Sequence, residues 1–241
     1  MARSVITIRS LGKFGRFGNQ LFQYAFARAM AQRFGAELQT PPWIGQKLFG
    51  LSDPPVTRQL PTLQRDQVPD APNVDLHGYF QQSRHLQYLS HAKIRAMYRF
   101  LPRWVERYGK PAHARPYIAA HLRRGDYVKR YSTYFCIVSR ESYLRAREHF
   151  GLQNHAMVWY SDETAPPDGG EFSFLRDFFG MMHADVLLRA NSTFSWWAGT
   201  LGTARVYSPF VENKVGPSDV EFVEGNWAPI TGHHDKLVLP P

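Results

Sequence analysis

The segment from His121 to Asp126, HLRRGD, places two adjacent arginines directly after the apolar run 117–120. That run predicts a short buried strand. A guanidinium group is always charged and can hold a phosphate through two parallel hydrogen bonds. Ligands of open α/β sheets bind beyond the carboxyl ends of the strands, so Arg123 and Arg124 are predicted to contact a phosphate group. The alternative is a solvated turn in which the arginines pair with Asp126.

Polar residues also follow other predicted strands. Ser161 and Asp162 come after one apolar run, and the segment 191–194, NSTF, follows another and leads into a predicted helix. Hydroxyl and amide groups at such a junction can form hydrogen bonds with a phosphate. Ordinary helix capping by Ser192 or Ser195 is the alternative. Because several polar clusters fall at the carboxyl ends of strands, a ligand crevice is predicted there.

A glycine-rich loop joins the first predicted strand, 5–8, to a predicted helix, 19–34. Glycine lets the backbone approach a phosphate, and a helix N-terminus attracts anions. The spacing is GxxGxxG, whereas the dinucleotide fingerprint is GxGxxG, so a nicotinamide site is the weaker interpretation. Asn19 is placed to cap this helix, and Gly35 to end it.

The order of predicted elements defines the fold class. Strands are predicted at 5–8, 36–40, 77–80, 117–122, 157–160, 186–188 and 204–207, and helices at 19–34, 86–108 (interrupted near Pro102), 140–150, 173–183 and around Trp196 and Trp197 up to Gly202. Strands that alternate with helices predict an α/β fold with parallel sheets covered on both faces. The proline-rich segment 41–75 has no clear period, so the N-terminal half is predicted to be less regular. A linker near 110–116 divides the chain into halves 1–112 and 113–241.

Composition narrows the ligand class. The 241 residues carry a formal charge of +9, which favours phosphate-bearing ligands or an anionic surface. The basic residues are scattered, so the charge alone does not indicate nucleic acid. The single cysteine, Cys136, excludes an internal disulfide framework and a cysteine-based zinc site, and it is expected to be buried. The ten histidines show no metal-ligand spacing, so no metal site is expected.

The localisation expected from the sequence is cytoplasmic. The first residues show no secretory signal, and no apolar run approaches the roughly 20 residues that span a bilayer. With this net charge, an anionic membrane surface is a further candidate contact.

Four segments together resemble the α-1,2-fucosyltransferases of glycosyltransferase family 11. They are 15–25 (GRFGNQLFQYA), 77–81 (HGYFQ), 121–127 (HLRRGDY) and 191–198 (NSTFSWWA), in the order of the family. The third is also similar to α-1,6-fucosyltransferases, and GRFGNQ resembles the opening loop of protein O-fucosyltransferases. The resemblance implies a GT-B-like fold with two Rossmann-like halves, an acceptor-side N-terminal half and a GDP-sugar-binding C-terminal half. It also implies inversion at the sugar carbon without a metal or any other cofactor.

The resemblance assigns roles to several of the residues above. His121 would contact the nucleotide and Arg123 the β-phosphate, with Arg124 beside it. Asn19, next to Gly18, would lie between the donor phosphate and the acceptor. Asp126 either acts in catalysis or orients the arginines, and no residue is clearly the general base.

The remaining donor contacts would come from the second half of the chain. The diphosphate and base would be held by Asn191, Ser192, Thr193 and Phe194, with Ser161 and Asp162 as further donor-site candidates. An aspartate before the Ser-Thr-Phe-like element reads guanine in the O-fucosyltransferases, and Asp185 holds the similar position here. The alternative for Asp185 is a cap or salt bridge beside the strand 186–188. Trp196 and Trp197 are expected in the core.

The activity that this resemblance implies is transfer of L-fucose from GDP-fucose to a sugar hydroxyl of an oligosaccharide or glycoconjugate, with O2 of a galactose-type residue as the expected site. Departures such as Arg16-Phe17 within GRFGNQ and Glu163 after Ser161-Asp162 leave the acceptor and the linkage open. The alternatives are transfer from a GDP-sugar to another acceptor, a non-catalytic glycan-binding protein, and a basic nucleic-acid-binding module.

Overall fold

The structure, a computed structural model, describes residues 3–110, 113–163 and 169–227. Two compact units divide the chain, and the division falls after Pro102. The sequence placed the boundary about ten residues later, at the proline-containing linker. Helix α5 (Pro102–Tyr108) begins at the division.

The first unit holds a small parallel sheet whose strand order is β2-β1-β3. Its elements are β1 (Val5–Thr7), α1 (Phe17–Arg33), β2 (Glu37–Gln39), α2 (Ile44–Phe49), β3 (Val74–Asp75), α3 (Ser83–Leu86) and α4 (His91–Met97). The predicted strands 5–8 and 36–40 are confirmed. The segment 41–73 contains only α2 as regular structure, in agreement with its lack of a period.

Helix α1 is buried on nearly all sides. Thirteen of its seventeen residues are buried, including Gln20 and Gln23. Aromatic side chains from the surrounding segments account for this: Trp43 stacks on Tyr24 at 4.7 Å, and Phe80 on Phe26 at 4.4 Å. A helix surrounded in this way is a central core element rather than a surface helix.

Two predictions in this unit were wrong. The segment 77–80 is irregular rather than a strand, because Gly78 and Phe80 have positive φ angles of 153° and 55°. The Asp66 carboxylate replaces a strand partner there and accepts hydrogen bonds from the backbone N–H groups of Tyr79 and Phe80, both at 2.7 Å. The predicted helix 86–108, interrupted near Pro102, was wrong at its start, because residues 87–90 lie outside a helix; α4 and α5 occupy the rest, with the break at 98–101.

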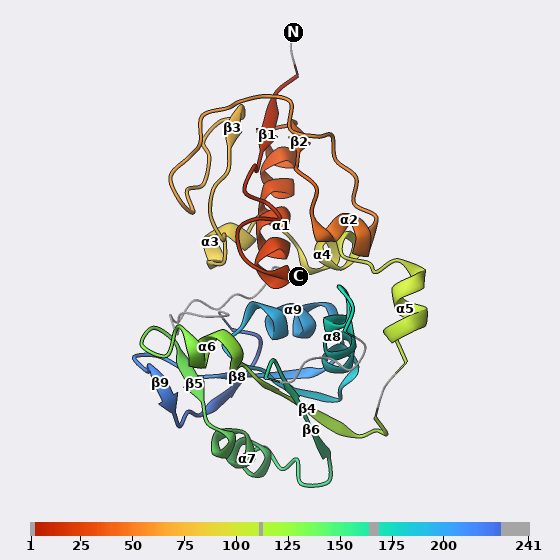
Figure 1. The fold of residues 1–241 in the computed structure, drawn as a ribbon, viewed down its shortest axis with the longest axis vertical. Coiled ribbons are helices and arrows are strands. Elements are labelled where there is room, and N and C mark those ends of the chain that lie inside the picture. Colours follow the sequence, from red (N-terminus) through yellow and green to blue (C-terminus); the bar gives the residue numbers. More distant parts are fainter. Residues whose placement is uncertain (1–2, 111–112, 164–168, 228–241) are drawn as a thin grey trace. The chain divides into compact units, whose positions relative to one another are not determined.

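The second unit is built on a five-stranded sheet whose order is β10-β8-β7-β4-β6; Figure 1 labels β4, β6 and β8 of this sheet. Its elements are β4 (Tyr117–Leu122), α6 (Gly125–Lys129), β5 (Cys136–Val138), α7 (Arg140–His149), β6 (Ala156–Ser161), α8 (Phe174–His183), β7 (Val186–Leu188), α9 (Thr193–Leu201), β8 (Arg205–Pro209), β9 (Gly216–Ser218) and β10 (Phe222–Glu224). The strands are parallel except β10, and β5 pairs with β9 in a separate parallel ribbon. All five elements predicted between 117 and 188 are confirmed. The strand at 204–207 is present but is not the last, because β9 and β10 follow.

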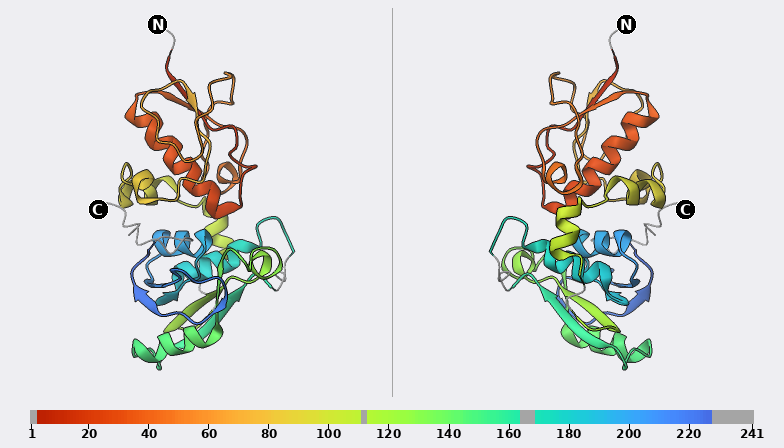
Figure 2. Two further views of the ribbon diagram at one scale, coloured as in Figure 1. Left: turned by 90° about the vertical axis from the view of Figure 1, so that its left-hand side faces the viewer. Right: turned by 90° about the vertical axis from the view of Figure 1, so that its right-hand side faces the viewer.

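Strand β4 divides its side chains between two faces of the sheet, as the alternation of a strand requires. Ile118, Ala120 and Leu122 enter the core cluster that contains Tyr143 of α7. On the other face, the Tyr117 hydroxyl donates to the Gly180 carbonyl of α8 at 2.7 Å. Helix α7 therefore covers one face, and α8 and α9 the other (Figures 1 and 2).

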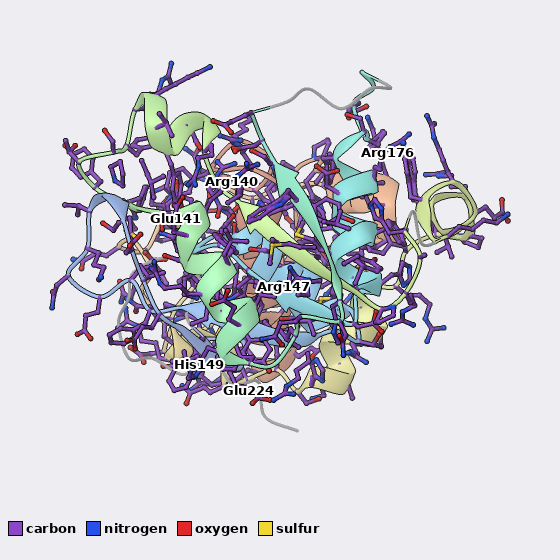
Figure 3. All side chains as sticks on the ribbon, turned by 90° about the horizontal axis from the view of Figure 1, so that it is seen from below. Arg140, Glu141, Arg147, His149, Arg176 and Glu224 are labelled. Atoms are coloured by element: carbon purple, nitrogen blue, oxygen red, sulfur yellow. The ribbon has the colours of Figure 1, made fainter. Side chains whose placement is uncertain are left out.

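The termini of α7 show why the sequence predicted this helix well. Ser139 caps it by accepting from the Ser142 N–H, Glu141 lies in the first turn, and Arg147 and His149 lie in the last. Acidic groups at the start and basic groups at the end complement the helix dipole. Figure 3 labels Glu141, Arg147 and His149 along this helix.

Within the three described ranges, no helix combines the length and the apolar composition that a membrane-crossing segment requires.

Candidate functional site

The strand order reverses at β4. The chain first moves outward from β4 to β6, then crosses back so that β7 lies on the other side of β4. Open α/β sheets bind ligands at the carboxyl ends of the strands at such a reversal. The segments 121–126 and 191–194 follow β4 and β7, so the topology brings both phosphate-suited segments to this position.

Arg123 is held between two carboxylates. Its Nη1 donates to Asp162 and its Nη2 donates to Asp126, while its guanidinium lies 5.1 Å from the ring centre of Tyr127. The side chain is 14% exposed, so it is fixed yet still reachable. Arginine has five N–H donors. The two ion pairs, within the described part of the chain, use one donor each, so three more could donate to a ligand.

Asp162 also fixes the turn that carries the arginines. Its Oδ1 accepts from the Arg124 backbone N–H at 2.8 Å. A Cβ on Gly125 would lie 2.5 Å from Asp162 Oδ2, so glycine is needed for this close approach. The β4–β6 register pairs Leu122 with Ser161, which brings Asp162 beside the arginines. Ser161 forms a hydrogen bond with Glu163: the Glu163 N–H donates to the Ser161 Oγ at 3.3 Å.

Tyr127 links the two segments directly. Its hydroxyl donates to the Asn191 carbonyl at 3.0 Å, and the Asn191 side chain donates to the Cys136 carbonyl at 3.0 Å. Ser192 is the N-cap of α9, with its Oγ accepting from the Phe194 N–H at 3.3 Å. The capping alternative is thus present, but it does not exclude anion binding, because the first turn of a helix still presents further N–H groups.

His121 lies in the buried part of the site, with its ring centre 5.8 Å from that of Phe194. Burial and the neighbouring Arg123 guanidinium lower the pKa of His121 to about 3, although Asp162 opposes them. Its Nδ1 is buried and has no hydrogen-bond partner among the described residues, which makes it a candidate contact for a ligand. A neutral imidazole of such low pKa suits binding and is a poor general base.

Arg189 is a second cation of the site and was missed by the sequence motifs. It is 1% exposed and donates to the Ser208 Oγ, the Ala190 carbonyl and the Trp227 carbonyl, at 2.7, 3.0 and 2.5 Å. Burial lowers the pKa of its guanidinium to about 9, so it remains cationic at neutral pH. One feature of the sequence could have revealed it: Arg189 directly follows an apolar strand, and a charged residue is rarely buried in such a place.

Asn19 lies in the third position of α1 rather than at its N-cap, which is Arg16. Its Oδ1 accepts from Gln81 Nε2 at 2.9 Å. A Cβ on Gly15 would lie 2.4 Å from Asn19 Nδ2, so the loop needs glycine there. Phe14 stacks on Tyr79 at 4.3 Å. The motifs 15–20 and 77–81 therefore form one cluster in the first unit, with Gly18 buried at the start of α1.

Asp185 lies at the start of β7 and not with the carboxyl-end cluster, so its expected contact with guanine stays a prediction. Its Oδ2 accepts from the Tyr117 N–H at 3.0 Å, and it pairs with Arg115. Although burial opposes ionisation, these two partners hold the pKa of Asp185 below its ordinary value. Tyr117 opens β4, and five residue steps along a strand, roughly 17 Å, separate it from Leu122. The salt-bridge alternative is the one present.

Within the described residues, no group of three or more His, Cys, Asp or Glu side chains could hold a metal ion. Trp196 and Trp197 are fully buried, and Cys136 is buried, as the sequence predicted.

Solved structures share this fold. Fucosyltransferase NodZ from Bradyrhizobium superposes with a TM-score of 0.60 at 13% identity, over 93% of this chain and 100% of that chain. NodZ α-1,6-fucosyltransferase co-crystallized with GDP gives 0.60 at 14% identity, over 94% and 100%. No protein-family model and no curated protein sequence matches the chain. The similarity confirms the predicted α/β, GT-B-like fold with parallel sheets in both halves.

His121 makes stability depend on acidity. In the unfolded chain it binds a proton below about pH 6.5, whereas the folded protein keeps it neutral until about pH 3. The unfolded state therefore binds more protons between these values, and stability falls as pH falls. From pH 7 to pH 5, this group is expected to remove about 2 kcal/mol of unfolding free energy.

Urea unfolding of the native protein and His121→Asn at both pH values measures the effect. The variant should lose about 2 kcal/mol less on acidification. His113→Asn, at an exposed position outside the helices, is the matched control and should follow the native protein. Parallel losses in the native protein and His121→Asn would contradict the burial of a neutral His121.

Proposed function

We propose that this protein is an inverting, metal-independent glycosyltransferase that moves L-fucose from GDP-fucose to a sugar hydroxyl. The observation that carries the proposal is the hydrogen bond from Tyr127 to Asn191, which joins the HLRRGD and NSTF segments where the strand order reverses. The motif resemblance supports GDP-fucose as the donor. The acceptor in this proposal is O2 of a galactose-type residue on an oligosaccharide or glycoconjugate.

The chemistry of the transfer matches the charges at β4 and β7. Cleavage of the bond between fucose and GDP builds negative charge on the leaving phosphate, and without a metal fixed donors must stabilise that charge. Arg123 supplies its remaining N–H groups, Arg124 a second guanidinium, and the first turn of α9 backbone N–H groups. His121 and Phe194 would contact the nucleotide, and Ser192 and Thr193 the diphosphate. Asp126 and Asp162 act on Arg123 as positioning groups.

The first unit has the acceptor-side role in this proposal. Asn19 and its partner Gln81 would present amide groups to the acceptor or to the donor phosphate. The structure describes this cluster and the arginine cluster in separate units, so the role of Asn19 rests on the motif resemblance.

Calorimetry and product analysis test the proposal. GDP is expected to bind at moderate salt more tightly than ADP, and labelled GDP-fucose to give a fucosylated product that persists in excess EDTA. An acceptor panel with linkage analysis separates O2 transfer from O6 transfer. GDP binding with a product of another linkage favours the other-acceptor alternative. Glycan binding without product favours a lectin-like protein, and oligonucleotide binding without GDP binding refutes the site.

Asp185→Asn is expected to leave GDP affinity unchanged. Asp185 holds the start of β4 rather than the ligand end, and its loss removes a charged acceptor from the Tyr117 N–H and the pair with Arg115. The stability cost should be about 1 kcal/mol because the pair is largely solvated. Melting curves and GDP titration of Asp185→Asn and Arg115→Ala check this. A tenfold weaker GDP affinity in folded Asp185→Asn alone would restore the guanine contact.

A further inference from the structure

Exposed apolar side chains gather in two short segments of the second unit. Of the seven large hydrophobic residues that are exposed in the described parts of the chain, five lie within 128–134 and 210–215. They are Val128, Tyr131, Tyr134, Phe210 and Val215, and Tyr134 is 74% exposed. A concentration of this kind marks a contact surface, whereas single exposed apolar residues are ordinary.

The two segments lie next to each other. Segment 128–134 leads into β5 and segment 210–215 into β9, and these strands pair in parallel with Cys136 opposite Gly216. The Gly216 N–H donates to the Phe135 carbonyl at 3.0 Å, so the pairing starts at the ends of both segments. Figure 1 shows α6, β5 and β9 together on one side of the unit. We call 128–134 and 210–215 together the β5–β9 patch.

The patch has a packed base. Phe135 stacks on the buried Tyr127 at 4.7 Å, and Tyr131 meets Phe135 edge-on at 5.8 Å. The Lys214 ammonium donates to the Asp219 carbonyl, which ties the second segment to the next turn. The exposed groups are therefore presented from an ordered surface.

The net positive charge of the β5–β9 patch favours an anionic partner. It contains Lys129, Arg130 and Lys214 but only one carboxylate, Glu212. Aliphatic and aromatic groups in the same short segments as lysine and arginine suit the boundary between lipid headgroups and acyl chains, where tyrosine rings and long cationic side chains satisfy both environments. A glycan platform would instead need polar groups that bind hydroxyls, which valine and phenylalanine do not supply.

We propose that the β5–β9 patch docks on an anionic lipid surface. Lysine and arginine near such a surface each strengthen binding, and partly inserted apolar side chains add to it. This property is independent of the proposed transfer reaction. Helix α6 carries Asp126 in its first turn and ends at Lys129, so docking would hold the candidate donor site one short helix away from the surface.

Co-sedimentation with vesicles tests this inference. The protein is expected to bind vesicles that contain phosphatidylglycerol, more weakly at high salt, and not to bind vesicles of phosphatidylcholine alone. Lys129→Glu with Arg130→Glu should lower binding at least about 25-fold, at about fivefold for each lost cation. Val128→Ser with Val215→Ser should lower it about tenfold.

Val105→Ser and Leu144→Ser are the matched controls, because these residues are 47% and 46% exposed but lie outside the patch. Both should bind as the native protein does. All variants should keep the native melting temperature and GDP affinity, which separates this test from that of the transfer reaction. Absence of vesicle binding, an equal loss in the controls, or patch variants that abolish only self-association or binding of soluble glycans would overturn the proposal.

Discussion

Arg123→Ala is expected to reduce turnover of GDP-fucose by about 10²-fold or more, because removal of one fixed donor to developing charge has that effect in comparable sites. Two carboxylates hold the guanidinium in one orientation, so no reorganisation is needed as the leaving phosphate gains charge. Steady-state kinetics with saturating acceptor measures the change. The loss should fall mainly on kcat, since the interaction strengthens in the transition state.

The control variants separate charge from geometry. Arg123→Lys should recover little activity, because an ammonium cannot satisfy Asp126 and Asp162 together and still offer donors to phosphate. Arg130→Ala removes an exposed arginine just beyond α6 and should leave soluble-acceptor kinetics unchanged. Near-native turnover in Arg123→Ala would remove Arg123 from the mechanism.

Asp162→Ala is expected to lower kcat by about 10- to 10²-fold without contact between Asp162 and the substrate, since small misplacements of a catalytic group have effects of this size. The carboxylate holds Arg123 through one oxygen and the Arg124 N–H through the other. Its loss frees the side chain of the first arginine and the backbone of the second. GDP affinity should change less than kcat.

A double-mutant cycle tests whether Asp162 acts through Arg123. In the Arg123→Ala background, Asp162→Ala should lower kcat by a smaller factor than in the native protein, because only its hold on the Arg124 N–H remains to be lost. Additive losses would show that Asp162 has an independent role. Glu163, the next residue, exchanges hydrogen bonds with Ser161, and Glu163→Ala serves as the neighbouring control.

The predictable elements were those with strong local signals. The run 117–122 is apolar and bounded by proline and arginine, and the structure has β4 at these same residues. Helix α7 carries its cap and end charges in the sequence. Helix α6 and strands β5 and β9 have five residues or fewer, too few for a period to appear. The start of α1 was misplaced because Arg16, which caps it without a side-chain bond, is not a preferred capping residue.

The sequence predicted which strand ends carry the candidate site, but it did not predict the hydrogen bonds and ion pairs that connect them. That Arg123 pairs with Asp162 depends on the parallel register of β4 and β6, which only the fold supplies. The bond from Tyr127 to Asn191 likewise joins residues 64 positions apart. Asp185 was chosen by motif position, and it precedes β7, whereas the other donor-site candidates of this unit lie at or beyond the ends of strands; its contact with guanine therefore stays a prediction. Arg189 escaped notice because charged residues are rarely fully buried.

In the proposed reaction, the two carboxylates that hold Arg123 also bear on how long the spent nucleotide would stay bound. The formal charges of Arg123, Arg124, Asp126 and Asp162 cancel. With Arg189 the cluster carries a net charge of +1 rather than +3, so it attracts a diphosphate less strongly than its three arginines alone would. The N–H groups that would bind the phosphate have fixed directions. They therefore favour the departing phosphate in its reacting geometry over other anions. Interactions that stabilise the transition state more than the bound product do not slow the dissociation of that product. The residence time of GDP would then depend on short-range hydrogen-bond geometry rather than on net charge. Such a site favours repeated turnover over retention of GDP.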